Sequence, residues 1–295
     1  MTEIFGIPLA ALMGQLMLGL VNGSFYALMS LGLAVIFGML QIINFAHGAM
    51  YMMGAMFAWI ALVHLGVGYW WSLALVPAAV GAIGIVIERS LLKWIYKLDH
   101  LYGLLLTFGL ALIITGGFRH VFGSSGQPYS IPPALAGAVD LGFMFMPKYR
   151  LWVIVASLFV CLFTWYMIEK TRLGAYLRAA TENPALTQAF GINVPVMVML
   201  TYAFGSALAG FAGVLAAPTT QVSPLMSSNM IITVFAVVVI GGMGSIMGSI
   251  ITGLGLGVLE GLTKVFYAQA SSTVIFVVMV IVLMFRPTGL FGKEN

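Results

Sequence analysis

The chain of 295 residues carries very little charge: only 7% of its residues are Asp, Glu, Lys or Arg, whereas 62% are hydrophobic. An ordinary soluble domain has about 25% charged residues, and a fold of this length could not cover its water-facing surface with so few. The composition therefore excludes a soluble protein and predicts a membrane protein. The net charge of +4 is attributed to basic loops and not to nucleic-acid binding.

The N-terminal part of the chain has no charged residue from Ile4 to Ile87. A helix needs about 20 apolar residues to cross the hydrocarbon core, so this stretch is long enough for roughly three crossings. Its segments are apolar on all sides and do not alternate, which favours membrane-spanning helices over a transmembrane barrel. A cleavable signal peptide is not expected, because the one early charge is that of Glu3 and a signal peptide begins with positive charge.

Charge clusters and turn residues divide the chain into candidate spans. The pair within 229–263 could be two helices or one broken element. The predicted fold is therefore an all-α polytopic bundle of eight or nine transmembrane helices in a single membrane domain, residues 1–295. The candidate spans are 9–31, 34–62, 71–87, 101–118, 151–168, 195–217, 229–246, 248–263 and 272–286.

Three polar residues, Gln41, Asn44 and His47, fall within the second candidate span. Polar groups within a span are costly and usually face a cavity or another helix. Their spacing of three would place them on one helix face. Two interpretations follow: a polar stripe along a route through the bundle, or helix-to-helix hydrogen bonds that hold the bundle together.

The distribution of Lys and Arg predicts the orientation of the bundle. Segments 88–100 and 169–190 each contain three basic residues, while 119–150 spreads three over 32 positions. Because basic residues concentrate in cytoplasmic loops, the first two segments are expected in the cytoplasm. The C-terminus would then lie inside and the N-terminus outside.

The second of these basic segments contains the signals of a short helix outside the membrane. Asn183 is a good N-cap, Pro184 suits the first helical position and Gly191 suits a left-handed C-terminal position. The predicted helix of seven residues, 184–190, is roughly 10 Å long. Leu186 and Phe190 share one of its faces. The helix could be an ordinary amphipathic connector or a plug for a groove on a partner.

Small residues recur at every fourth position in the C-terminal part of the chain, which predicts close packing of helix backbones or a surface along which helices slide. A shorter row of the same kind is Gly205, Ala209, Gly213 and Ala217. The longer row is Gly241, Ser245, Ser249, Gly253, Gly257 and Gly261.

The chemistry of an enzyme or of a self-powered pump is absent from the sequence. There is no phosphate-binding Walker A motif, no metal-ligand spacing and no catalytic constellation, so no catalytic, cofactor or metal residue is expected. Glu260 precedes Lys264 by four positions, which favours an interfacial ion pair over a coupling-ion site. The chain is therefore either a passive channel or a subunit driven by another protein.

Five stretches of sequence resemble one known family. They are the two N-terminal stretches Gly19–Gly38 and Gln41–Gly48, the segment Gly174–Asn193, and the motifs Gly241–Ser245 and Arg286–Gly292 at the C-terminal side. In the order in which they occur they resemble the permease subunits of high-affinity branched-chain amino acid ABC transporters. The shorter of the two permease types of that family is the better match.

The resemblance implies a subunit of the bacterial inner membrane that forms the pathway of an ATP-driven importer. Its implied partners are membrane lipid, a related longer permease, two ATP-binding subunits that hold the ATP, and an extracytoplasmic binding protein. The alternative is a stand-alone channel or facilitator for small polar solutes such as urea or amides. Segment 169–194 resembles the cytoplasmic loop that contacts the ATPase. The residues assigned to that contact are Arg172, Arg178, Glu182, Asn183, Pro184, Leu186, Phe190 and Gly191.

Overall fold

The computed structural model describes residues 3–4, 7–96 and 98–292, and it confirms the predicted all-α bundle. Two short antiparallel strand pairs accompany the helices, β1 (Glu3–Ile4) with β2 (Ile7–Pro8) and β3 (Ala138–Asp140) with β4 (Phe145–Pro147). The α-helices are α1 (Leu9–Leu40), α2 (Ala46–Leu65), α3 (Tyr69–Ser90), α4 (His100–Phe122), α5 (Lys148–Lys170), α6 (Arg172–Glu182), α7 (Pro184–Ala189), α8 (Val194–Ala216), α9 (Met226–Gly241), α10 (Ile246–Phe266) and α11 (Val274–Phe285). Three short 3-10 helices are η1 (Leu92–Trp94), η2 (Pro133–Leu135) and η3 (Ala268–Ala270).

Seven helices of the described chain are long and apolar enough to cross a membrane: α1, α2, α3, α4, α5, α8 and α10. The apolar helices α9 and α11 are shorter, with 16 and 12 residues. At 1.5 Å per residue they extend only about 24 and 18 Å. The uncertain pair within 229–263 is two separate helices, because a turn at residues 242–245 divides α9 from α10.

The first boundary between spans was predicted too early. Instead of ending near residue 31, α1 continues through Leu40 as a helix of 32 residues. Gly32, at the predicted boundary, is helical and permits close packing. A Cβ atom at this position would lie 2.9 Å from Cε1 of His47 and 3.0 Å from the carbonyl oxygen of Gly205. The actual break follows at 41–45.

The core of the bundle is built around α1 and α8. The most extensive helix contacts are those of α1 with α10 and of α8 with α3, α2 and α1. In contrast, α4 and α11 are peripheral and bury few of their side chains. Their exposed faces are apolar, as expected for helices that contact lipid.

Small residues allow α1 and α10 to approach closely, which agrees with the packing interpretation of the longer row. A Cβ atom at Gly253 would lie 2.5 Å from Cα of Ala27, and one at Gly19 would lie 2.5 Å from the carbonyl oxygen of Gly257. The row is not one continuous ridge, however. Gly241 is the last residue of α9 and Ser245 is the N-cap of α10, so the helix break removes both from the ridge that faces α1.

The shorter row lies on α8 and contacts two neighbouring helices. Gly205 packs against Gly32 and Ile36 of α1, whereas Gly213 packs against the backbone of α2 at Gly54. These contacts place α8 between α1 and α2. Small side chains on α8 therefore determine the spacing of the core.

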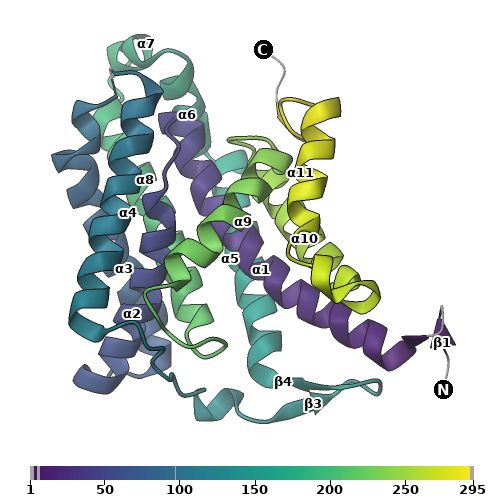
Figure 1. Cartoon of the computed structure of the whole chain (residues 1–295). Coiled ribbons are helices and arrows are strands. Elements are labelled where there is room, and N and C mark those ends of the chain that lie inside the picture. Colours follow the sequence, from purple (N-terminus) through teal and green to yellow (C-terminus); the bar gives the residue numbers. More distant parts are fainter. Residues whose placement is uncertain (1–2, 5–6, 97, 293–295) are drawn as a thin grey trace.

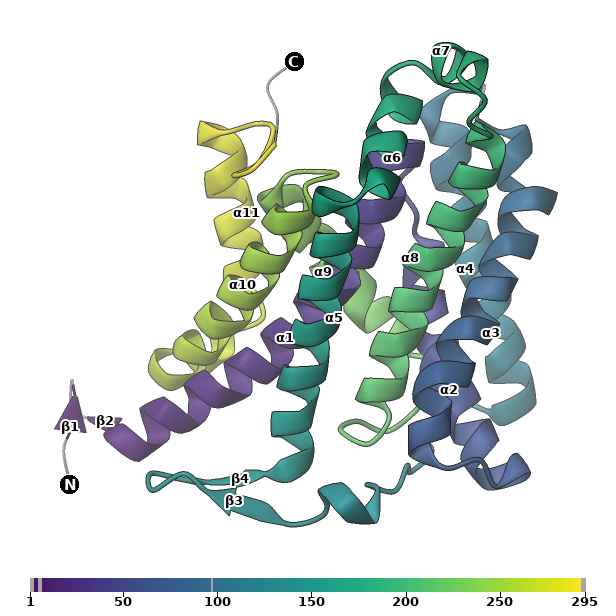
Figure 2. The same cartoon turned by 180° about the vertical axis from the view of Figure 1, so that it is seen from behind.

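The two ends of the bundle differ in the elements they carry (Figure 1). One end, named the α7 end here, carries α6, α7, the connection between α3 and α4, and the C-terminal end of α11. The opposite end, named the hairpin end, carries the β3–β4 hairpin, which Figure 2 shows from behind. The two segments with dense basic charge therefore share one end, as the sequence predicted.

Candidate functional site

The short helix predicted outside the membrane is α7, and its ends are formed by the expected residues. The side chain of Asn183 accepts a hydrogen bond from the backbone N–H of Leu186, at 3.0 Å. Pro184 is the first helical residue, and Gly191 adopts a positive φ of 84°. The helix ends at Ala189, one residue earlier than predicted, because Phe190 is the C-cap.

One side of α7 attaches the helix to the rest of the protein. Thr187 is its buried residue, and its hydroxyl group donates to the carbonyl oxygen of Asn183 at 2.9 Å. The chain then turns directly into α8, where the side chain of Asn193 accepts from the backbone N–H of Val196 at 3.2 Å. Caps on both helices therefore fix the orientation of α7 relative to α8.

The opposite side of α7 presents apolar side chains to the surroundings. Leu186 is 54% exposed and Phe190 is 78% exposed, and the two lie four positions apart on one face. Figure 1 shows α7 as the outermost element at its end of the bundle. A rigid helix with an exposed apolar stripe is a suitable surface for a groove on a second protein.

Helix α6, which precedes α7, carries charged residues. Arg178 lies 3.5 Å from the carboxylate of Glu169 and donates to the carbonyl oxygen of Ile168 at 3.4 Å. Arg172 and Glu182, at the two ends of α6, are exposed. The eight residues predicted for this surface therefore lie on α6, on α7 and at the caps of α7. All of them are at one end of the molecule.

Helix α6 also contacts the end of α1. The hydroxyl group of Thr181 donates to the carbonyl oxygen of Leu177 at 2.9 Å and lies 3.5 Å from that of Gly38. On its other side, Gly38 lies against Gly244 in the turn between α9 and α10. A continuous path of contacts therefore runs from α6 through α1 to α10. The sequence analysis did not identify Thr181 or Gly38, since neither has a local pattern that sets it apart.

The two C-terminal motifs of the resemblance contact one another. The backbone N–H of Leu290 donates to the carbonyl oxygen of Ile240 at 2.8 Å, and that of Phe291 donates to Gly241 at 3.2 Å. Gly242 has a φ of 98° and packs against the backbone of Gly292. The chain after α11 is thereby fixed to the turn between α9 and α10.

The predicted polar row of Gln41, Asn44 and His47 does not form, because no single helix passes through these residues. Gln41 ends α1 with a left-handed φ of 52° and is exposed. Asn44 lies in the non-helical link and His47 lies in the first turn of α2. The three residues therefore share no helix face.

Asn44 and His47 are both completely covered by other parts of the bundle. The Asn44 amide donates to the hydroxyl group of Tyr202 on α8 at 3.3 Å. His47 Nε2 donates to the carbonyl oxygen of Met29 on α1 at 3.0 Å. Within the described residues, Asn44 Oδ1 and His47 Nδ1 have no hydrogen-bond partner. These contacts match the interpretation in which the polar groups hold the bundle together.

Two acidic residues are buried and hydrogen-bonded. Glu88 accepts from the hydroxyl group of Tyr96 at 2.8 Å, and burial together with this carboxylate raises the pKa of Tyr96 above its usual value. Tyr96 therefore remains a neutral donor. Glu260 accepts from Tyr26 at 2.7 Å and from Lys264 at 2.6 Å, which agrees with the ion pair predicted from their spacing.

At the hairpin end, two loops that are far apart in the sequence are joined. Gln127 and Val222 exchange two backbone hydrogen bonds, of 2.8 and 3.0 Å. Figure 2 shows the loop that contains β3 and β4 extending across this end of the molecule. Among the described residues, no group of three or more His, Cys, Asp or Glu side chains could hold a metal ion.

Comparison with known proteins adds to this geometry. The family described as branched-chain amino acid transport system / permease component matches residues 15–283. The chain is 32% identical to the high-affinity branched-chain amino acid transport system permease protein BraD of Pseudomonas aeruginosa, over 95% of this chain and 96% of BraD. It is 29% identical to the LivH permease protein of Escherichia coli K12, again over 95% and 96%. It is 27% identical to the probable LivH permease protein of Methanocaldococcus jannaschii, over 93% and 91%.

Proposed function

The chain belongs to the branched-chain amino acid transport permease family, and from that membership we propose that α6 and α7 form the surface on which an ATP-binding subunit acts. The protein is a permease subunit of an ABC importer in the inner membrane and is not an enzyme, since ATP hydrolysis is the task of partner subunits. Its cargo class is the branched-chain amino acids. Membership of this family does not favour the alternative of a stand-alone channel for urea or amides.

The observation that carries the proposal is the exposed apolar stripe of α7. Leu186 and Phe190 project from a helix that is capped at both ends and attached to α8. Exposed apolar side chains of this size are typical of a protein contact. Because α7 is short and firmly held, a force applied to it would displace α8 and α6 and would not be absorbed by bending.

Movement of α7 would reach the core of the bundle through two connections. The first is the direct continuation into α8, which packs on α1, α2 and α3. The second is the contact of Thr181 on α6 with Gly38 near the end of α1. Gly38 in turn contacts Gly244, in the turn before α10. ATP binding then changes the balance between inward-open and outward-open arrangements, provided that the nucleotide-bound partner fits one of them better.

The remaining partners are assigned by the same reasoning. A second permease, a related and longer paralogue, forms the translocation route together with this subunit at their interface. The extracytoplasmic binding protein delivers the amino acid to the hairpin end. Support for that position comes from the joined loops at Gln127 and Val222 and from the exposed β3–β4 hairpin.

The proposal is tested by placing charge on the apolar stripe. The double variant Leu186→Asp/Phe190→Asp is expected to insert normally but to lose co-purification with the ATP-binding subunits, because two carboxylates would have to be buried in an apolar contact. Transport should fall in parallel. Co-purification of the tagged permease from membranes measures the effect.

The matched control places the same two charges at exposed positions of α7 outside the stripe. Ala185 and Gln188 are exposed and lie away from the stripe. The variant Ala185→Asp/Gln188→Asp should therefore retain the ATP-binding subunits. Equal retention by both double variants would show that the stripe is not the contact surface.

A further inference from the structure

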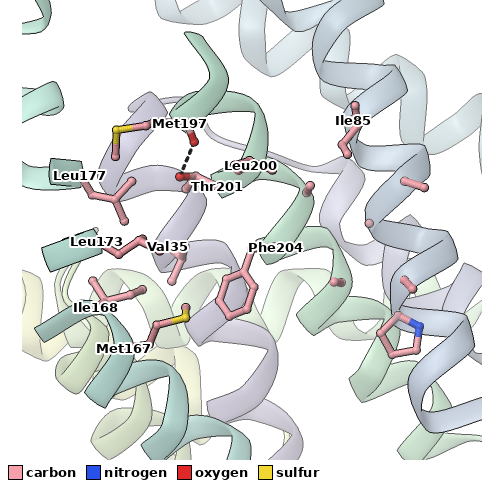
Figure 3. A pocket seen from close by; sticks show the side chains of 16 residues that line it. Val35, Ile85, Met167, Ile168, Leu173, Leu177, Met197, Leu200, Thr201 and Phe204 are labelled. Carbon is pink, nitrogen blue, oxygen red and sulfur yellow. Dashed lines mark hydrogen bonds between the residues drawn. The ribbon is translucent and has the colours of Figure 1, made fainter. Parts of the chain in front are cut away.

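An apolar groove with a volume of about 490 Å³ lies between α1, α3, α5, α6 and α8. Figure 3 shows the 16 side chains that line it. Thr201 is the polar member of this set, and its hydroxyl group donates to the carbonyl oxygen of Met197 at 2.8 Å. The groove is hollow because small residues of α3 and α8 face it, namely Ala78, Gly81, Ala82, Ala203 and Ala207.

The groove is elongated along the helix axes and begins near the α7 end. On α3 its lining extends from Pro77 to Ile85, and on α8 from Met197 to Ala207. At 1.5 Å per residue these stretches are about 12 and 15 Å long. Met167 and Ile168 line it close to the end of α5 at Lys170. The groove therefore runs from the boundary of the membrane toward its middle.

Positive charge lies at the boundary end of the groove. Leu173 and Leu177 of α6 line it, and Arg172 and Arg178 are their neighbours in the sequence. The guanidinium group of Arg178 donates to the carbonyl oxygen of Ile168, whose side chain is in the lining. Arg178 also forms an ion pair with the carboxylate of Glu169, whose side chain is about half exposed.

The start of α6 adds a second feature that suits an anion. The hydroxyl group of Thr171 donates back to the carbonyl oxygen of Met167 and does not cap α6. Among the described residues, no side chain caps the first N–H groups of α6. N–H groups at a helix start bind phosphate readily, and here Arg172 is the first residue of the helix.

We propose that the groove holds one acyl chain of an anionic phospholipid, whose phosphate lies against Arg172, Arg178 and the start of α6. A transported amino acid does not fit, because its ammonium and carboxylate groups would be buried without partners. An acyl chain needs no hydrogen bonds, and the basic groups at the boundary attract anionic headgroups. The lipid would thereby contact α6, the helix that precedes α7.

The experiment counts phosphatidylglycerol bound to the assembled transporter. The complex is placed in nanodiscs of phosphatidylcholine and phosphatidylglycerol, and the retained lipid is measured by native mass spectrometry. Ala78 lines the groove, while its neighbour Ala79 is exposed outside it. Ala78→Phe should reduce retained phosphatidylglycerol about tenfold by filling the groove, whereas Ala79→Phe should retain it.

Three further variants make the result decisive. Arg172→Gln and Arg178→Gln should each reduce retention about fivefold, as expected when a basic group leaves an anionic membrane surface. Ala82→Phe, at another lining position, replaces Ala78→Phe if that variant does not assemble.

Several outcomes would overturn the proposal. Undiminished retention by the Phe variants at the groove is one. Equal retention of phosphatidylcholine and phosphatidylglycerol is another, since it would indicate ordinary surrounding lipid. A third is a cross-link from a photoreactive residue at position 78 to another transporter subunit, which would make the groove a subunit interface. The readout is bound lipid, so these outcomes leave the contact of α7 with the ATP-binding subunit to its own test.

Discussion

At the residue scale, His47 is a polar side chain whose surroundings decide its role. It is fully buried, its Nε2 donates to the carbonyl oxygen of Met29, and its ring lies against Gly32. Asn44 is held in a similar way by Tyr202. His47 therefore joins the start of α2 to α1, and Asn44 joins the link between α1 and α2 to α8.

From this role we expect His47→Ala to lower the stability of the folded protein. Uptake per amount of folded protein should be unaffected. Removing the ring leaves a cavity and removes its hydrogen bond to the carbonyl oxygen of Met29, with an expected loss of about 2–3 kcal/mol of stability. Thermal unfolding of the purified protein measures the loss, and uptake is normalised to the folded amount. Gln41→Ala, at an exposed position, should change neither. A His47→Ala protein of normal stability that no longer transports would indicate contact with the solute instead.

At the element scale, some features were predictable from sequence and others were not. The helix α7 was predictable because Asn183, Pro184 and Gly191 act on their own backbone, and local chemistry is visible in sequence. The end of α1 was not, because Gly32 has the same appearance in a turn and in a close helix contact. Only the position of α8 shows that Gly32 is needed for packing.

The same limit applies to contacts between distant segments. The contact of the chain end after α11 with the turn before α10 rests on backbone hydrogen bonds from Leu290 and Phe291. The groove beside α6 arises because five helices meet. The hydrophobic periodicity of the sequence predicts neither the chain-end contact nor the groove. Both features depend on which helices lie next to one another.

The contact between α1 and α10 predicts a clear difference between two glycines of one helix. Gly257 packs directly against Gly23, whereas a Cβ atom at Gly255 would meet nothing within 4 Å. Gly257→Val should therefore cost about 3 kcal/mol through overpacking and reduce the amount of folded protein in the membrane. Gly255→Val serves as the control, and its folded yield should be unchanged. Similar yields for both variants would contradict the close packing of these helices.

At the scale of the whole molecule, the two ends of the bundle carry different elements, which our proposal assigns to different partners. Apolar side chains of α7 and the arginines of α6 lie at one end, and the β3–β4 hairpin lies at the other. The bundle between them contains few charges, and the acidic residues Glu88 and Glu260 are neutralised or hydrogen-bonded within it. In the proposed account, partner subunits hydrolyse ATP and deliver motion to this bundle at the α7 end.

The most direct test of this account is the accessibility of a cysteine at position 190. The native Cys161 is buried, so a membrane-impermeant thiol reagent should report on Phe190→Cys. The reagent is applied to the outer and to the cytoplasmic side of the membrane, with and without the ATP-binding subunits. The account predicts labelling from the cytoplasmic side alone, and protection when those subunits are bound. Labelling from the outer side, or labelling that the ATP-binding subunits leave unchanged, would contradict it.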